Sequence, residues 1–459
     1  MADTGEAGWA GGYPVDRSYA PNLQPDLAPD HLDLVTLACG RLPPAAGGRF
    51  RYLELGCGFG VGLAALAAVN PHGHFAGLDF LPEHIASASR LRDEAGLGNL
   101  DLVETDFESF AAEDGPRFDY IVLHGVFTWI SPRNRAAVVE ILRRRVAPGG
   151  LVYVGCNAMP AWAALAPGRR ILRDMLAAGR GEPAAVRATL ARWIETDGSA
   201  AARAFWSRME GLPDAYLLHE FGAEHGDALW SVELDAAMAP AKLSRVGSTR
   251  LQHTMDALRF DEAQRERLKA AEAEGWGTTA RDLLANASFH HAVFARGAPR
   301  ASEAQTARLL GARLVAAAPP PPPDRPRRRP LSGGIEEALA AALGGGRRAV
   351  AALADELAAR IGLTPRKALQ AIILALATER LVSLRDDAAT HAAADGAERF
   401  NAVARRRLEE GAPLPGLASA RLGGAVAVPR RWQAMVLGME PPDAEALAAL
   451  GPLGLLEPH

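Results

Sequence analysis

The sequence predicts an α/β fold built around a parallel sheet, and three observations lead to that prediction. Residues 52–55 are apolar enough for a buried strand, apart from Glu54, and they run into a turn with glycine at every second position. The small and apolar residues 61–69 then have the composition of a helix. Strand-like and helix-like segments continue to alternate as far as Asn157, which is typical of a parallel sheet with right-handed crossovers.

The other elements are expected from local composition. A helix with Asp30 as its cap is predicted at 30–38, ahead of the first strand at 50–55. The alternating part continues with strand 74–79, helix 82–96, strand 99–106, strand 118–124, helix 134–146 and strand 151–157. Helices at 170–178, 183–194 and 200–209 interrupt the alternation. Strands six and seven of the sheet are then expected at 242–247 and 289–295, with a charged helix at 261–274 between them.

This order of elements divides the chain into an N-terminal arm and helix over the ligand site (1–48), a sheet core (49–157), a helical insertion or lid (158–240), the last strands of the core (241–297), a Pro/Arg-rich linker (298–330) and a C-terminal helical domain (331–459). The proline run at 319–323 is typical of a stiff spacer. A chain ending near Arg296 is therefore expected to fold without the C-terminal domain. The helix, helix, strand order of that domain is compatible with a winged-helix-like unit.

Length and composition limit the functional classes. A chain of 459 residues is expected to form two or three domains, and 49% hydrophobic with 23% charged residues is ordinary for a folded protein. The net charge of −4 does not favour nucleic-acid binding. The three cysteines have no metal-ligand spacing, so no metal is expected, and they fit a reducing compartment. Neither a signal peptide nor a membrane span is recognised, so we expect a cytoplasmic protein.

Polar residues stand where several of the strands end, and such strand ends are where parallel sheets bind ligands. The second and third strands end in Asp79 and Asp106, and the fourth and fifth end in His124 and Asn157. The dinucleotide fingerprint G-x-G-x-x-G does not fit the glycine turn, because its third glycine would fall on Val61 or Leu63.

The pattern E-x-G-x-G-x-G at 54–60 resembles motif I of class I S-adenosylmethionine (SAM) methyltransferases. Residues 53–60, 74–79, 118–130 and 148–162, Tyr216-Leu-Leu-His-Glu220 and 400–415 resemble one bacterial subgroup of that class. Its members carry a methyltransferase regulatory domain, and the rickettsial protein-lysine methyltransferases of outer-membrane proteins belong to it. Gly155-Cys156 and Ala161 depart from the subgroup's common Ser-Tyr and Gly, which affects the substrate pocket more than the SAM site. The resemblance implies a Rossmann-like seven-stranded methyltransferase sheet.

The resemblance implies SAM as the cofactor, held by side chains at the strand ends. Asp79 is placed to accept hydrogen bonds from both ribose hydroxyls, and Asp106 from the adenine amino group, with Phe107 beside it for stacking. Glu54 fixes the loop or reaches the methionine amine through water. A single strand-end Asp is more often a helix cap. The full predicted set of cofactor residues is Glu54, Gly56, Cys57, Gly58, Gly60, Asp79, Phe80, Asp106, Phe107 and His124.

Two polar residues are expected to face the methyl acceptor. His124 would take a proton from it or orient it, the alternative being a histidine bonded to the backbone. Asn157 would accept a hydrogen bond from an amine. The predicted substrate and lid residues are Tyr13, Tyr19, Trp129, His219 and Glu220; the alternatives are a surface arm for the two tyrosines and a bridge between helices for His219 and Glu220.

A protein lysine is the predicted methyl acceptor, on the family resemblance alone. An Asn-Pro-Pro-Tyr motif, typical of glutamine and adenine N-methyltransferases, is absent after the fourth strand, where Gly125-Val-Phe-Thr128 stands instead. The alternatives are a small-molecule O- or N-methyltransferase and a SAM-binding regulatory protein without turnover. We expect neither a nucleic-acid partner nor membrane insertion, and we leave a homodimer open.

Overall fold

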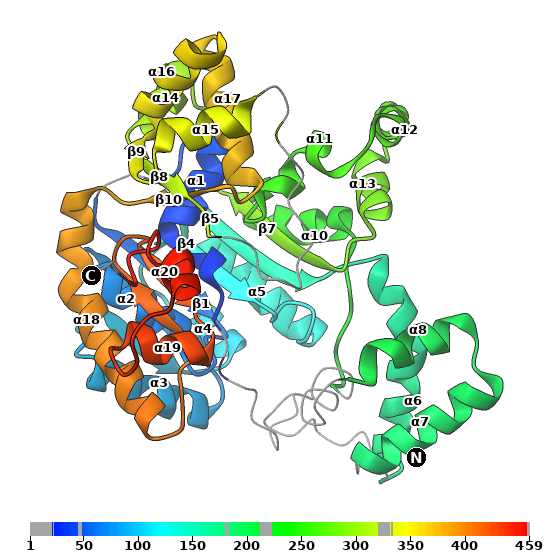
Figure 1. The fold of residues 1–459 in the computed structure, drawn as a ribbon. Helices are drawn as coiled ribbons and strands as arrows, with labels where there is room; N and C mark the ends of the chain where they lie inside the picture. Colours follow the sequence, from blue (N-terminus) through cyan, green and yellow to red (C-terminus); the bar gives the residue numbers. More distant parts are fainter. Residues whose placement is uncertain are drawn as a thin grey trace.

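The computed structural model describes residues 21, 23–44, 48–179, 183–211, 223–319, 331 and 334–456. The predicted substrate residues Tyr13, Tyr19, His219 and Glu220 lie outside these ranges, as does most of the proline- and arginine-rich stretch 319–330. The described part of the chain contains a seven-stranded sheet, a three-stranded sheet and a two-stranded sheet, with helices around them (Figure 1).

The large sheet has seven strands in the order β3-β2-β1-β4-β5-β7-β6. Strands β1 to β5 pair in parallel, whereas β7 runs antiparallel to both β5 and β6. All seven strands were predicted, with ends that agree within two residues except at β5, which begins at Val146 rather than at Leu151. Their bounds are β1 Phe50–Leu55, β2 Gly73–Asp79, β3 Leu100–Glu104, β4 Phe118–His124, β5 Val146–Asn157, β6 Ser244–Ser248 and β7 Phe289–Ala295.

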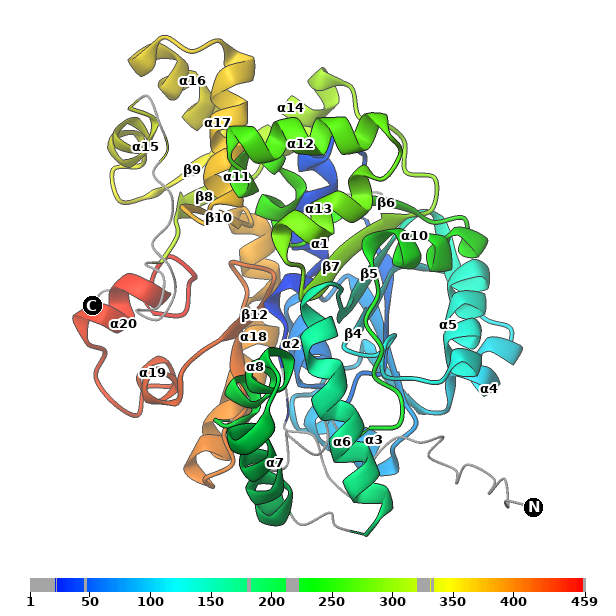
Figure 2. The same ribbon diagram turned by 90° about the vertical axis from the view of Figure 1, so that its right-hand side faces the viewer.

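Alternating side chains of the strands build two separate apolar cores, one on each face of the sheet. Tyr52, for example, is buried on one face and Leu53 on the other. The first core includes the helices α1 (Pro29–Ala38), α2 (Val61–Val69) and α3 (Pro82–Glu94). The second includes α4 (Phe107–Ala112), α5 (Pro132–Arg145) and α10 (Ser231–Met238), of which α5 and α10 lie along the same side of the sheet in Figure 2.

The helical insertion forms its own apolar cluster. Helices α6 (Ala166–Ala177), α7 (Pro183–Asp197) and α8 (Ala200–Met209) follow β5 and form a group of their own at the lower right of Figure 1. The prediction placed the end of this insertion at 240, but Leu234 and Met238 of α10 are fully buried against the sheet. The helix at 231–238 therefore belongs to the core, since its apolar side chains complete the second face.

The segment between the last two strands is mainly helical. It comprises η4 (Leu251–Thr254), α11 (Asp256–Arg259), α12 (Glu262–Ala273) and α13 (Gly277–Ala285). The charged helix predicted at 261–274 corresponds to α12. Leu251 in η4 contributes to the first core, so this connection covers the sheet near the ends of β6 and β7.

The predicted linker at 298–330 is wrong over its described part. Residues of this stretch form α14 (Glu303–Gly311) and β8 (Leu314–Ala317). Strand β8 is the middle strand of an antiparallel sheet in the order β10-β8-β9, and its partners are β9 (Arg347–Ala349) and β10 (Leu381–Leu384). Helices α15 (Ile335–Leu343), α16 (Val350–Ile361) and α17 (Pro365–Ala377) complete this unit.

The C-terminal region is not spaced apart from the core. Helix α18 (Asp387–Glu409) lies against α2, which separates it from the sheet in both views (Figures 1 and 2). Buried residues of α18 such as Phe400 join the first core, as do residues of β11 (Gly416–Ser419) and β12 (Gly424–Ala427). The short helices α19 (Arg430–Val436) and α20 (Ala444–Leu450) follow.

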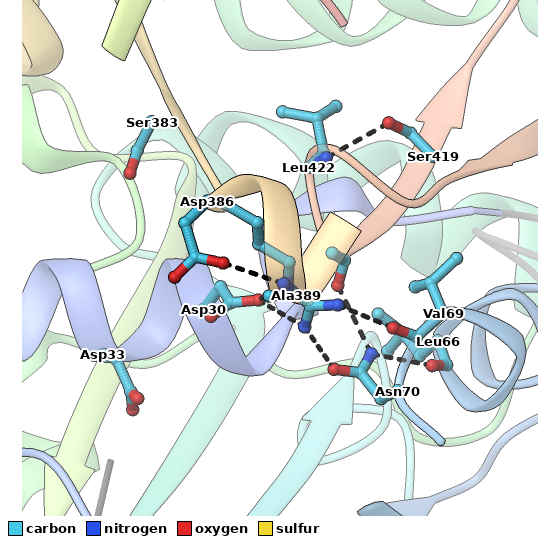
Figure 3. Close-up of polar contacts among 12 residues, drawn as sticks. Asp30, Asp33, Leu66, Val69, Asn70, Ser383, Asp386, Ala389, Ser419 and Leu422 are labelled. Atoms are coloured by element: carbon cyan, nitrogen blue, oxygen red, sulfur yellow. Dashed lines mark hydrogen bonds and ion pairs between the residues drawn. The ribbon is translucent and has the colours of Figure 1, made fainter. Parts of the chain in front are cut away.

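A buried arginine ties this region to the core, and Figure 3 labels its partners Asp30, Val69 and Asn70. Arg385, between β10 and α18, donates to Asp30 of α1 at 2.6 Å and to the carbonyl oxygen of Val69 at 2.6 Å. It also donates to the side chain of Asn70, at the end of α2. The Arg385 side chain is only 9% exposed, so the loss of these partners would leave a buried charge uncompensated.

Within the described ranges, no helix is both long enough and apolar enough to cross a membrane.

Candidate functional site

The turn between β1 and α2 is held open by its glycines. Gly56, Gly58 and Gly60 have φ values of 72°, 55° and 66°, a conformation that side chains other than glycine rarely adopt. A Cβ at Gly56 would lie 2.7 Å from a methyl carbon of Val126, so space also restricts this position. A Cβ at Gly58 would have nothing within 4 Å. The backbone at Gly58 therefore faces open space, where a ligand can approach it closely.

Asp79, the last residue of β2, is bonded to the glycine turn. Its Oδ2 accepts from the backbone N–H of Gly58 at 2.9 Å, and its Oδ1 accepts from the N–H of Leu81 at 3.0 Å. The Nδ1 of His84 lies 3.2 Å from the same Oδ1, and the two side chains are 6% and 9% exposed. Asp79 thus fixes the shape of the turn. Its Oδ1 faces two partners, whereas Oδ2 accepts one hydrogen bond and still has a lone pair for a ligand hydroxyl.

Glu54 is half-buried on β1 close to Asp79. The loss of solvent around its carboxyl and, to a lesser extent, the negative charge of Asp79 together raise the pKa of Glu54 to about 8. Burial also holds the pKa of the Cys57 thiol well above its usual range. Both groups therefore favour their uncharged forms at neutral pH.

Asp106 lies beyond the third strand, which ends at Glu104 rather than at Asp106 as predicted. The Asp106 side chain caps α4: it accepts from the N–H and from the hydroxyl of Ser109, both at 2.8 Å. Both bonds lower the pKa of Asp106, and the bond from the backbone N–H of Ser109 has the larger effect. The side chain is exposed and Phe107 beside it is half-buried, as is Phe80 after β2. The structure therefore shows the helix-cap arrangement that was the alternative for this residue.

Among the described residues, the side chain of His124 bonds to Tyr153 rather than to the backbone, and it belongs to a group of rings at the end of β4. Its Nδ1 lies 2.9 Å from the hydroxyl oxygen of Tyr153, and that oxygen lies 3.1 Å from the Nδ1 of His291. The ring of Phe289 is 5.1 Å from that of His124, and the ring of His253 is 6.5 Å from that of His291. Three strands and η4 thus contribute the five rings of this group, and two of them, His124 and His291, contact the Tyr153 hydroxyl.

The histidines of this group are neutral at physiological pH. Burial lowers the pKa of His124 to about 4, that of His253 to about 4 and that of His291 to about 3. An ion pair borders the rings: Arg250 Nε lies 3.0 Å from Asp26 Oδ2. The positive charge of Arg250 lowers all three pKa values, and Asp26 raises those of His124 and His291.

Asn157 ends β5 and is 3% exposed. Its backbone N–H donates to the hydroxyl of Thr128 at 3.4 Å. Its side-chain nitrogen Nδ2, however, is buried and has no hydrogen-bond partner in the structure. A buried amide without a partner costs free energy, so it marks a place where a ligand oxygen or a water is expected.

Trp129 connects the loop after β4 to the insertion. Its ring meets that of Trp162 edge-on at 5.9 Å, and the guanidinium of Arg169 lies 5.7 Å from its centre. Trp129 packs against the apolar cluster of α6, α7 and α8, so the insertion is attached to the sheet beside the ends of β4 and β5.

Sequence reasoning missed four residues of the site: His84, Tyr153, His253 and His291. His84 stands in the first turn of α3, five residues after Asp79, and this spacing could have suggested a contact. Tyr153 and His291 lie on different strands and meet only because β5 and β7 pair antiparallel, with Gly155 opposite His291. The pair His290-His291 within an apolar strand was the signal available in the sequence.

Comparison with known families covers most of the sheet. Residues 53–152 match the family described as methyltransferase domain, and residues 213–296 match the predicted methyltransferase regulatory domain. The strand order 3-2-1-4-5-7-6, with β7 antiparallel, is typical of class I methyltransferases. The chain carries a class I SAM-dependent methyltransferase domain. The regulatory match includes β6 and β7, so part of the regulatory domain is built into the methyltransferase sheet.

Proteins similar to this methyltransferase are found in bacteria. An uncharacterised protein of Synechocystis is 31% identical over 301 residues, which are 63% of this chain and 59% of that protein. An uncharacterised protein of Rickettsia prowazekii is 28% identical over 144 residues, 31% of this chain and 57% of that protein. The matches therefore span less than two thirds of these relatives.

The solved structure of PKMT2 from Rickettsia typhi in complex with AdoHcy has a similar fold. It matches with a TM-score of 0.68 and 17% identity over 92% of this chain and 88% of that one. The cofactor of this methyltransferase class is SAM, and the residues of this chain fit it. The open space beside Gly58 lets a ligand reach the backbone, and Asp79 stands next to it as a hydroxyl acceptor.

Proposed function

We propose that this methyltransferase transfers the methyl group of SAM to the side-chain amine of a protein lysine. The main observation in favour of a SAM site is the hydrogen bond from the N–H of Gly58 to Asp79. This bond joins the acid at the end of β2 to the glycine turn, where a Cβ at Gly58 would have nothing within 4 Å. A backbone of this shape, with a carboxylate beside it, suits a ligand with adjacent hydroxyls and no phosphate.

In this proposal the cofactor lies across the ends of the first strands. Asp79 accepts from the ribose hydroxyls while it keeps the bond to Gly58, and Phe80 and Phe107 flank the adenine. Asp106 caps α4, so it offers the adenine amino group only the lone pairs that Ser109 leaves free. Glu54, whose burial favours the protonated form, acts beneath the glycine turn.

The acceptor is proposed to enter beside His124 and Asn157. Methyl transfer requires the nucleophile to stand in line with the sulfonium and its methyl group. A lysine amine must also lose a proton before it attacks. His124 is neutral and can accept a hydrogen bond from the amine, and the unpartnered Nδ2 of Asn157 can donate a hydrogen bond to an oxygen of the substrate. Trp129 and the insertion that it anchors border this entrance.

The lysine assignment is supported by the resemblance to rickettsial protein-lysine methyltransferases and by the likeness of the fold to PKMT2. A small-molecule acceptor and a regulatory SAM binder are the competing functions. The three cysteines are free thiols, which accords with our proposal of a cytoplasmic protein.

Incubation of cell extract with the full chain and methyl-labelled SAM tests this proposal. Tandem mass spectrometry should find the label on the Nε atoms of protein lysines. Label on small molecules, or on other atoms of proteins, would refute the lysine assignment. No label at all, with SAM bound, would support a regulatory role instead.

A further inference from the structure

One hydroxyl group connects two histidines on opposite sides of β5. His124 on β4 pairs with Gly155 on β5, and Gly155 pairs with His291 on β7, so the three residues form one row across the sheet. Tyr153 is two residues before Gly155 and therefore lies on the same face of the sheet. Its hydroxyl oxygen is 2.9 Å from the Nδ1 of His124 and 3.1 Å from the Nδ1 of His291.

Gly155 makes this arrangement possible. A Cβ at this position would lie 2.6 Å from the Nδ1 of His124 and 2.6 Å from the hydroxyl oxygen of Tyr153. Any side chain in the middle of the row would push the hydroxyl away from the histidines. The Tyr153 hydroxyl thus occupies the space that a side chain at position 155 would fill.

Hydrogen-bond counting constrains the protons of the two rings. A tyrosine hydroxyl has one proton to donate, and a neutral histidine carries a proton on only one of its nitrogens. Both contacts of the buried hydroxyl are satisfied when it donates to one Nδ1 and accepts from the other Nδ1–H. The two neutral rings must then be opposite tautomers: one has a free lone pair on Nε2, and the other has a proton there.

We infer that Tyr153 and His291 are positioning residues that make His124 a proton acceptor and carry the proton away from it. This inference rests on the proposed function, because it assigns the proton of the acceptor amine. The resting state has the proton of His124 on Nδ1, where it is donated to Tyr153, and a lone pair on Nε2.

The proton then moves through the row in balanced steps. The ammonium group of the acceptor gives a proton to Nε2 of His124, whose Nδ1 proton passes to the oxygen of Tyr153. The hydroxyl proton of Tyr153 passes to Nδ1 of His291, and the Nε2 proton of His291 leaves to water. One proton has moved from the amine to water, the amine is neutral, and both histidines are neutral in the reversed tautomers. Exchange with water in the opposite direction restores the resting state.

The surrounding charges favour transport over storage of the proton. Arg250, Asp26 and His253 face the two histidines, and burial together with Arg250 keeps His124 and His291 neutral. A ring that resists a lasting positive charge does not trap the proton. His124 and His291 are both half-buried and Tyr153 between them is buried, so the row has an accessible histidine at each end: His124 for the acceptor and His291 for water.

The direct test is ¹⁵N NMR of the full chain labelled at histidine, with His124→Gln and His291→Gln used to assign the two rings. Nitrogen shifts distinguish a protonated ring nitrogen from an unprotonated one. We expect opposite tautomers at His124 and His291 in the ligand-free protein at pH 7.5. The same tautomer at both positions would overturn the inference. This readout needs no methyl acceptor, so it stands even if the lysine assignment fails.

A kinetic test uses poly-L-lysine as the acceptor. Tyr153→Phe should lower the rate at pH 7.5 by at least about tenfold, because general-base catalysis is ordinarily worth about 10²–10⁴. Its rate should then rise with pH by about tenfold per unit, since the amine must arrive already neutral, whereas the native rate changes little between pH 7.5 and 9. Tyr52→Phe, which also removes a buried hydroxyl, bonded to the carbonyl oxygen of Leu27, is the control and should leave the rate within about twofold. Parallel pH profiles for the native and Tyr153→Phe proteins would overturn the inference.

Discussion

Gly396 tests whether the C-terminal region is part of the core. It lies inside α18 and is buried where this helix crosses α2. A Cβ at Gly396 would overlap the carbonyl oxygen of Ala68. The obstacle is backbone, which cannot rotate away as a side chain can. Gly396→Ala is therefore expected to destabilise the protein.

Two effects of opposite sign determine the size of this change. Alanine in place of glycine within a helix ordinarily stabilises by roughly 0.5–1 kcal/mol. An extra methyl group in a packed interface costs roughly 1–3 kcal/mol, since the helices must separate and lose contacts. The overlap with a carbonyl oxygen places this site towards the upper end of that range. We therefore expect a net loss of about 1–2 kcal/mol in the free energy of unfolding.

Urea unfolding followed by circular dichroism measures this change. Gly62→Ala is the matched control: Gly62 lies in α2, and its Cβ would have nothing within 4 Å. The control should be as stable as the native protein or more stable by up to about 1 kcal/mol. If Gly396→Ala were as stable as the control, α18 would not pack against α2, and the C-terminal region would not be part of the core.

Three further predictions concern the cofactor site, the C-terminal region and pH. Asp79→Ala should weaken SAM binding about tenfold to a hundredfold, because a hydrogen bond to a charged group is worth about 1.5–3 kcal/mol. The control Asp101→Ala, on the exposed edge of β3, should leave SAM binding unchanged. Calorimetry that finds equal SAM affinities for the two variants would refute the ribose assignment. A chain ending at Arg296 should be insoluble or unable to bind SAM, because it exposes the face of α2 that α18 covers; a soluble product that binds SAM normally would refute this. Stability should fall between pH 6.5 and 8. Burial raises the pKa of Asp33 to about 7 and that of Glu54 to about 8, so folding favours their protonated forms, and this contribution is lost as pH rises through those values. The lowered pKa values of His124, His253 and His291 act in the opposite direction, but only below about pH 6.5, the ordinary histidine value. Thermal midpoints of the ligand-free protein should fall less over this range in Glu54→Gln, and an unchanged slope would contradict the assignment.

The sheet was predictable because its signals are local. The apolar residues of β1, the glycines after it and the acid at the end of β2 are each visible in a few consecutive residues. The strand positions therefore came out correctly, and errors at the ends, such as β3 extended to Asp106, reflect the similarity of a strand end and a helix cap in sequence.

Contacts between distant segments were not predictable in this way. The proline run at 319–323 masked the short strand β8 just before it, whose four residues pair with β10 some seventy positions later. A glycine inside a helix, such as Gly396, gives no indication of the partner that requires it. Gly155 was noticed as a departure from the family pattern, but its role needs the register that places His124 and His291 on either side of it.

Photo-crosslinking of methyl-labelled SAM to the full chain, followed by peptide mapping, tests the central claim most directly. SAM is claimed to bind at the glycine turn and the adjoining strand ends. Label should appear in peptides that contain residues 54–60, 79–80 or 106–107, and excess AdoHcy should abolish it. Label confined to other parts of the chain, such as the C-terminal region, would contradict the account.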